Sequence, residues 1–196
     1  SAAALMEVKG DIIFKTKLGY DMMPSGPELI AAESFLRGGG AKERALLNYL
    51  NDLQEKYHYI IIDCPPSLNM LTINALVAAT GVVIPMQCEY LALEGLGVMV
   101  DLVSQVAQAS HRGLHISGIL MTMYNPSTNL SQQVVQEVIK HFGDRVFETL
   151  IPRNVRLSEA PSYGVPVNKH DPYCIGTAAY RSLAKEFIDR QSQSAQ

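Results

Sequence analysis

Residues 59–67 read Tyr59-Ile60-Ile61-Ile62-Asp63-Cys64-Pro65-Pro66-Ser67, and this stretch decides the fold class. An uninterrupted apolar run is typical of a strand that is buried on both faces of a parallel sheet. An acidic residue that directly follows such a strand lies at the sheet edge where open α/β folds bind ligands. Asp63 is therefore predicted to be functional, and an aspartate that merely caps the next helix is the alternative.

The rest of the chain alternates short apolar runs with longer amphipathic segments, which is the order of β-α-β units around a parallel sheet. The predicted strands cover residues 19–23, 58–62, 82–86, 116–123 and 146–151. The predicted helices cover residues 27–36, 41–56, 68–79, 92–109, 130–141 and 174–190. We expect a single α/β domain over residues 1–196, with a mostly parallel sheet and helices on both faces.

The composition excludes several classes of protein. The 196 residues carry a net charge of -3, so any contact with DNA must come from a local basic patch. Cys64, Cys88 and Cys174 show no CxxC spacing, and the histidines lack partners at metal-ligand spacing, which argues against a zinc site or a disulfide framework. A reducing cytoplasm is the expected setting. No apolar stretch is long enough to span a membrane.

Several ordered motifs together resemble those of one family, the ParA and Soj-type chromosome and plasmid partition ATPases. They are the segments 24–25, 63–67 with 71–76, 84–95 and 151–162, and the similarity runs from about Gly19 to about Phe187. The resemblance implies a P-loop NTPase-like fold of the ParA/MinD kind. It also implies ATP and Mg²⁺ as cofactors.

The resemblance assigns a nucleotide-binding role to two parts of the chain. Asp63 resembles the Walker B aspartate that holds Mg²⁺ through water, and Pro65, Pro66 and Ser67 resemble the switch that follows it. Pro152, Arg153 and Asn154 resemble the loop that packs against the adenine base, with Asn125 as a secondary candidate for the same pocket.

Further residues resemble the switch, the dimer interface and the DNA contact of the family. Gln87, Glu89 and Glu94 fall in a segment near the nucleotide and the dimer interface, although polar residues that merely end a strand are the alternative. Arg156 resembles an arginine that holds DNA phosphates, and pairing with Glu159 on the same turn is the alternative.

Two departures from the family pattern matter. Related sequences often carry a basic residue where Ser127 stands, so we expect DNA affinity to be weaker or arranged differently. Residues 1–196 also contain no Lys-Gly-Gly-x-Gly-Lys-Thr loop, and neither Gly38-Gly39-Gly40 nor Gly95-Leu96-Gly97 can replace it. We therefore expect a partial ATPase domain that lacks the N-terminal strand and P-loop, with no hydrolysis by this chain and hydrolysis by its full-length parent.

The resemblance implies an ATP-switched homodimer that binds DNA non-specifically and is released when a ParB/Spo0J-like partner stimulates hydrolysis. Such a protein is cytoplasmic and nucleoid-associated, and the tail 179–190 is poorly suited to lipid binding. A membrane-bound MinD-like relative is thus a weaker reading. A different alternative is a non-catalytic remnant, or an interaction module, that retains the C-terminal part of the fold. A dehydrogenase is disfavoured because no Gly-x-Gly-x-x-Gly follows a strand.

Overall fold

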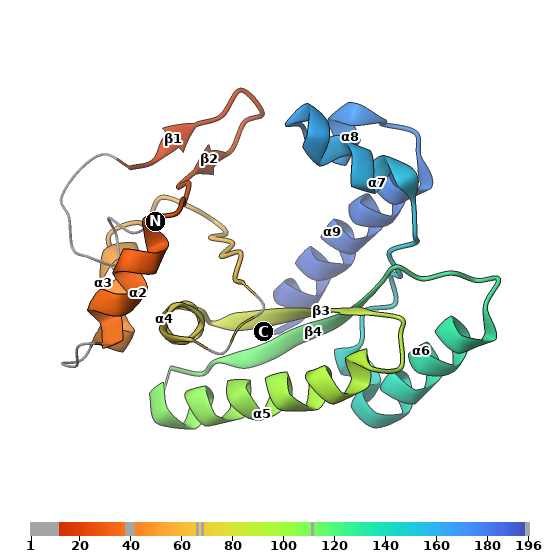
Figure 1. The fold of residues 1–196 in the computed structure, drawn as a ribbon, viewed down its shortest axis with the longest axis horizontal. Coiled ribbons are helices and arrows are strands. Elements are labelled where there is room, and N and C mark those ends of the chain that lie inside the picture. The colour runs from red at the N-terminus through yellow and green to blue at the C-terminus, as the bar shows by residue number, and fades with distance from the viewer. Residues whose placement is uncertain (1–11, 38–41, 66, 68, 111, 195–196) are drawn as a thin grey trace. The chain divides into compact units, whose positions relative to one another are not determined.

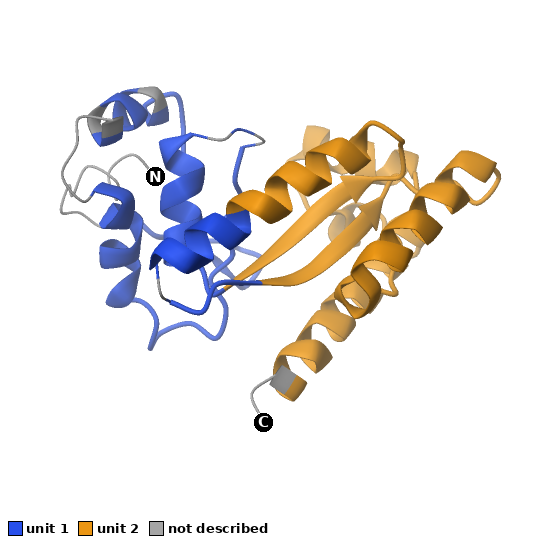
Figure 2. Cartoon of the chain, turned by 90° about the horizontal axis from the view of Figure 1, so that it is seen from below, with its two compact units in different colours: residues 1–80, 103–115 blue, residues 81–102, 116–196 orange. Residues whose placement is uncertain are grey.

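The computed structural model describes residues 12–37, 42–65, 67, 69–110 and 112–194. The chain divides into two compact units (Figure 2). Unit 1 contains residues 1–80 and 103–115, and unit 2 contains residues 81–102 and 116–196. The two units are described separately below. Among the described residues, no helix combines the length and the apolar character needed to cross a membrane.

The sheet of unit 2 is built on β3 (Gly81–Gln87) and β4 (His115–Thr122). The N–H of His115 donates to the carbonyl of Thr80 at 3.2 Å, and the N–H of Cys88 donates to the carbonyl of Thr122 at 3.0 Å. Residue numbers therefore rise together along the pair, and the strands are parallel. Residues 146–152 follow the other edge of β4 through parallel bridges, so the predicted strand 146–151 is found there as an extended segment.

Helices cover both faces of this sheet (Figure 1). Ile119 and Met121 of β4 pack with residues of α5 (Ala92–Ser110) and α6 (Asn129–Phe142). Leu120 lies between them in sequence and packs with Phe147 and with α9 (Ile175–Ser194) on the opposite face. This alternation is the period of two that a strand imposes on its side chains. The predicted α/β class, with a parallel sheet and helices on both faces, is confirmed.

Helix α9 closes the outer edge of the extended segment 146–152. The carboxylate of Glu186 accepts the N–H groups of Glu148 at 2.8 Å and Thr149 at 2.9 Å. Arg190 donates to the carbonyls of Asp144 at 2.8 Å and Val146 at 2.7 Å, and pairs with Glu186 at 2.7 Å. Helix side chains thus take backbone hydrogen bonds that a further strand would otherwise take.

Unit 1 contains a two-stranded antiparallel ribbon and a small helical cluster. In the ribbon, β1 (Phe14–Lys15) pairs with β2 (Asp21–Met22). Of the predicted strand 19–23, only residues 21 and 22 are in a strand. The helices are α2 (Leu29–Arg37), η1 (Lys42–Arg44), α3 (Ala45–Asn51) and α4 (Met70–Ala78). Asn74 is fully buried, and its Oδ1 accepts the N–H of Leu46 at 3.2 Å, so it satisfies a free amide at the start of α3.

Three sequence predictions need correction. Residues 58–62 do not form a strand of either described sheet, and the side chain of Ile61 is 92% exposed. An extended backbone becomes a strand only where a neighbour takes its hydrogen bonds. The predicted helix 41–56 is shorter, since α3 ends at Asn51. The sequence also missed the short helices η2 (Gly143–Arg145), α7 (Val155–Glu159), η3 (Ala160–Tyr163) and α8 (Val167–His170).

The contact between Glu186 and the backbone predicts an acid-sensitive part of the stability. Burial alone would raise the pKa of the Glu186 carboxyl, but hydrogen bonds from Thr149 and Glu148 and the charge of Arg190 hold that pKa below its ordinary value of 4.5. A carboxyl with a lowered folded-state pKa stabilises the fold above its unfolded pKa, and this contribution is lost as pH falls through the folded pKa.

Glu186→Gln should therefore lower the free energy of unfolding by about 1–2 kcal/mol at neutral pH. The difference from the wild type should shrink as the solution is acidified below the ordinary carboxyl pKa. Urea denaturation across this range measures both effects. Glu148→Gln is the matched control, since it removes the same charge from an exposed side chain. A difference for Glu186→Gln that does not change with pH contradicts the explanation.

Candidate functional site

The candidate site residues of unit 2 meet at the carboxyl edge of its sheet. Gln87 ends β3, and the bridge between Tyr124 and Pro152 lies just beyond the end of β4. The N–H of Arg153 donates to the carbonyl of Tyr124 at 3.0 Å. The structure thus brings Asn125 and the loop 152–154 side by side at the carboxyl edge of the sheet, where open α/β folds bind ligands.

Asn125 organises the turn that follows β4. Its Oδ1 accepts the N–H of Ser127 at 3.0 Å, and Nε2 of Gln132 donates to the carbonyl of Pro126 at 2.9 Å. Met123, two residues earlier, has a φ of 53°, in the left-handed region that costs free energy for a non-glycine residue. The carboxamide oxygen of Asn125 therefore serves the turn, and Ser127 contributes a backbone N–H and no charge.

The loop 152–154 leads directly into α7. Asn154 caps this helix, because its Oδ1 accepts the N–H of Arg156 at 2.9 Å. Arg153 is exposed, and Pro152 and Asn154 are half-buried. The loop therefore offers a cationic side chain at the sheet edge while Asn154 fixes the direction in which the chain leaves it.

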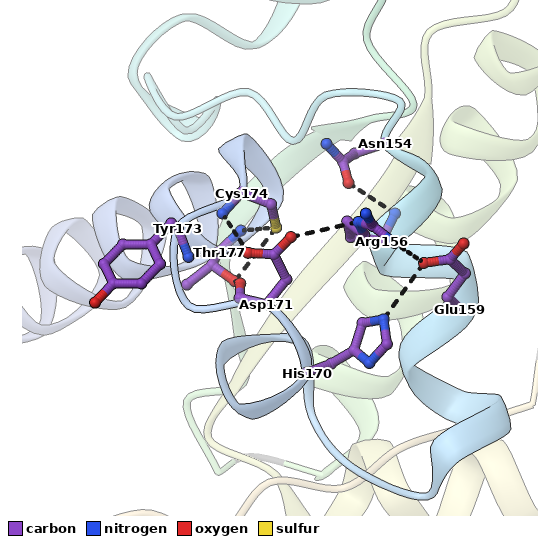
Figure 3. Close-up of polar contacts among 8 residues, drawn as sticks. All are labelled: Asn154, Arg156, Glu159, His170, Asp171, Tyr173, Cys174 and Thr177. Atoms are coloured by element: carbon purple, nitrogen blue, oxygen red, sulfur yellow. Dashed lines mark hydrogen bonds and ion pairs between the residues drawn. The ribbon is translucent and has the colours of Figure 1, made fainter.

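Arg156 is held between two carboxylates (Figure 3). Its Nη1 lies 2.8 Å from Oε2 of Glu159, and its Nε lies 3.3 Å from Oδ2 of Asp171. The hydrogen bond and the charge of Glu159 raise the pKa of Arg156, and the hydrogen bond from Arg156 lowers the pKa of Glu159 in turn. The pairing of Arg156 with Glu159 that the sequence left as an alternative is therefore present.

Sequence reasoning missed the second carboxylate and the histidine of this cluster. Nε2 of His170 lies 3.3 Å from Oε2 of Glu159, and the His170 ring stacks on Tyr163 at 4.7 Å between centroids. His170 ends α8 and Asp171 follows it. A helix of four residues leaves no periodic signal, so only the polarity of these residues could have drawn attention to them.

In unit 1, the switch candidates are tied to the start of α4. The N–H of Ser67 donates to the carbonyl of Pro65 at 2.8 Å, and Oγ1 of Thr72 donates to the carbonyl of Ser67 at 2.5 Å. Asn69 caps α4 by accepting the N–H groups of Leu71 and Thr72, each at 3.1 Å. Pro66 lies outside the described residues.

Asp63 is exposed and precedes this turn by two residues. Burial raises the pKa of the neighbouring Cys64 thiol, and the Asp63 carboxylate raises it further. The described residues contain no cluster of three or more His, Cys, Asp or Glu side chains that could hold a metal ion.

The three interface candidates lie around the turn between β3 and α5. The N–H of Glu89 donates to the carbonyl of Gln87 at 2.8 Å, and the N–H of Ala92 donates to the carbonyl of Glu89 at 3.1 Å. Glu94 lies in the first turn of α5, where a negative charge interacts favourably with the helix dipole and stabilises the helix. All three side chains are exposed.

Comparisons with known proteins identify the family. The sequence model of an AAA domain matches residues 4–116. The chain is 49% identical over 177 residues to the sporulation initiation inhibitor protein Soj of Bacillus subtilis, and the match covers 90% of this chain and 70% of Soj. The chain belongs to the ParA/Soj family of chromosome-partitioning ATPases.

A second curated relative of this ParA/Soj chain agrees with that assignment, and a solved structure shares its fold. The chromosome partitioning protein ParA of Caulobacter vibrioides is 43% identical over 192 residues, which cover 94% of this chain and 72% of that protein. A cobyrinic acid a,c-diamide synthase of Mycobacterium smegmatis, solved with ADP and magnesium, is 30% identical to this chain, with a TM-score of 0.82. The match covers 100% of this chain and 73% of the synthase chain. The chain spans about two thirds of the length of the curated relatives that it matches.

The cluster around Arg156 predicts a measurable pKa change. Arg156→Met removes the strongest hydrogen bond to Glu159, so the pKa of the Glu159 carboxyl should rise toward its ordinary value of 4.5. A carboxyl-carbon NMR titration measures this change. His170→Gln should raise the same pKa less, because its hydrogen bond to Glu159 is the second contribution. An unchanged Glu159 pKa in Arg156→Met shows that the pairing is not formed in solution.

Proposed function

We propose that this chain forms the part of a partition ATPase that carries the switch segment, the nucleotide-base loop and a DNA contact. The observation that carries the proposal is the continuous segment from Pro152 to Arg156, which joins a loop at the sheet edge to a helix that bears an exposed arginine. Membership in the ParA/Soj family supports both the base contact and the DNA contact proposed for this segment. Arg153 and Asn154, with Asn125 beside them, would contact the adenine base.

Asp63 would hold Mg²⁺ through water in the presence of ATP. The residues fit this role, because the carboxylate is exposed and a hydrated ion can reach it. When bound, Mg²⁺ would offset the negative charge of the phosphates. The hydrogen bonds that join Pro65, Ser67 and Thr72 would couple the position of this turn to α4. The M. smegmatis structure contains ADP and magnesium, which supports nucleotide and metal binding in this fold.

Dimerisation, DNA binding and stimulation by a ParB-like partner complete the proposed cycle. ATP binding would favour a homodimer in which Gln87, Glu89 and Glu94 lie near the interface. The dimer would bind DNA non-specifically through Arg156 and associate with the nucleoid. Hydrolysis stimulated by the partner would then release it. The partitioning role of the relatives supports this cycle.

DNA binding is tested with Arg156→Gln in the protein as its gene encodes it, including any sequence before Ser1. Fluorescence anisotropy with a duplex of arbitrary sequence and ATP should show weaker binding, on the order of five- to tenfold at low salt. The slope of log affinity against log salt should become shallower by about 1. Arg145→Gln is the control, because it removes an equal charge from an exposed position on η2. Equal losses for both variants would point to net charge alone.

Hydrolysis is tested with purified residues 1–196. We expect no sustained ATP turnover, because residues 1–196 contain no Lys-Gly-Gly-x-Gly-Lys-Thr loop to stabilise the charge of phosphoryl transfer. The protein as encoded is the comparison, and Asp63→Ala should reduce any turnover that it shows. Sustained turnover by residues 1–196 that disappears in Asp63→Ala overturns the expectation. Absence of turnover in the encoded protein as well would favour the non-catalytic alternative.

A further inference from the structure

The pairing of Arg156 limits how its guanidinium can meet a phosphate. A guanidinium presents its N–H donors in two forks, one formed by Nε with a terminal nitrogen and one formed by the two terminal nitrogens. Asp171 lies 3.3 Å from Nε and Glu159 lies 2.8 Å from Nη1. Each fork therefore includes a nitrogen that already contacts a carboxylate. A phosphate that binds bidentately competes with a carboxylate at one of its two nitrogens.

The charge of the cluster also opposes the binding of a phosphate to Arg156. One guanidinium faces two carboxylates, so the cluster carries a net negative charge when both carboxyls are ionised and His170 is neutral. The hydrogen bonds from Arg156 and His170 lower the pKa of Glu159, which keeps that carboxyl ionised at neutral pH. A phosphate approaching Arg156 therefore meets repulsion from these two groups before it reaches the guanidinium.

Both carboxylates are held in place by contacts of their own (Figure 3). His170, whose side chain is only 15% exposed, contacts Glu159 and is supported by its stack on Tyr163. Oδ1 of Asp171 accepts the N–H groups of Tyr173 and Cys174, each at 3.1 Å, which leaves Oδ2 directed at Arg156. Because the acceptors are fixed in advance, the ion pairs cost less side-chain entropy than a pair between two mobile side chains.

We propose that Glu159 and Asp171 form a clamp that weakens the grip of Arg156 on DNA. The inference rests on the DNA-binding function proposed above and concerns the regulation of that same contact. Phosphate must compete with two positioned carboxylates for one guanidinium. The contact is consequently weak and readily reversed, which suits a protein that has to leave DNA at the end of each cycle.

The test is Glu159→Gln in the protein as its gene encodes it, with ATP and a duplex of arbitrary sequence. We expect binding about two- to fivefold tighter than the wild type, which matches the strength of exposed ion pairs. Asp171→Asn should act in the same direction, since the asparagine Oδ1 still accepts the backbone N–H groups. Glu137→Gln on α6 is the matched control, because Glu137 is an exposed carboxylate that pairs with Lys140 and His141 instead.

Combination with Arg156→Gln decides whether the gain passes through this arginine. In that background Glu159→Gln should change the affinity no more than Glu137→Gln does, and circular dichroism confirms that each variant is folded. If Glu159→Gln and Asp171→Asn bind DNA as Glu137→Gln does, or if their gain persists without Arg156, the clamp is disproved while DNA binding stands. If the wild type itself does not bind DNA, the proposed function fails and the clamp fails with it.

Discussion

Unit 2 depends on the backbone hydrogen bonds that β4 makes along both of its edges. On one edge, Thr122 accepts the N–H of Cys88. On the other edge, the carbonyls of Ile119 and Met121 accept the N–H groups of Phe147 and Ile151, each at 2.9 Å. Because all these neighbours run parallel to β4, their carboxyl ends reach the same edge and their loops leave it together. Residues that are more than 60 positions apart in sequence, Gln87 and Pro152, become part of one edge for this reason.

The position of Arg156 follows from the same framework through α9. Leu183 and Phe187 of this helix pack against the face of the sheet that contains Leu120, and Glu186 and Arg190 bind the backbone of residues 144–149. Phe147, which packs against α9, also lies close to β4, since a Cβ at Gly118 would overlap its buried ring. With α9 fixed, the turn before it is fixed as well.

That turn carries Asp171 to Arg156. Thr177 donates from Oγ1 to the carbonyl of Asp171 at 2.7 Å, and the N–H groups of Tyr173 and Cys174, just before α9, bind the Asp171 carboxylate. A helix that seals the sheet therefore also sets the electrostatics of an arginine on α7. Under the proposed function, mutations in α9 far from Arg156 would act on DNA binding through this path, without a contact of their own.

The sequence predicted the features that local patterns encode and missed those that depend on distant contacts. The apolar runs at 82–86 and 116–123 and the helices at 92–109 and 130–141 were predicted, since each has its own periodicity. Residues 58–62 show the same apolar pattern as a buried strand, yet the pattern does not supply a pairing partner. Glu159 could be foreseen as a partner of Arg156 because it is three residues away on one turn. Asp171 could not be foreseen as a partner of Arg156, because its position depends on α8 and α9. The contact of Glu186 could not be foreseen either, because the backbone N–H of Glu148 that it accepts lies 38 residues away in sequence.

Under the proposed function, the net charge of -3 over these 196 residues provides little long-range attraction to DNA, so binding would depend on contacts at short range. Ser127 supplies a backbone N–H and no charge, and Arg156 is engaged by two carboxylates. Both features would reduce the number of phosphates that one subunit neutralises. A weak contact of this kind becomes effective when two copies are joined, because the second contact then forms at a high effective concentration. Under the proposed cycle, weak binding by one subunit is therefore what allows ATP-controlled dimerisation to switch DNA binding on and off, whereas a subunit that bound tightly alone would remain on DNA after the dimer had separated.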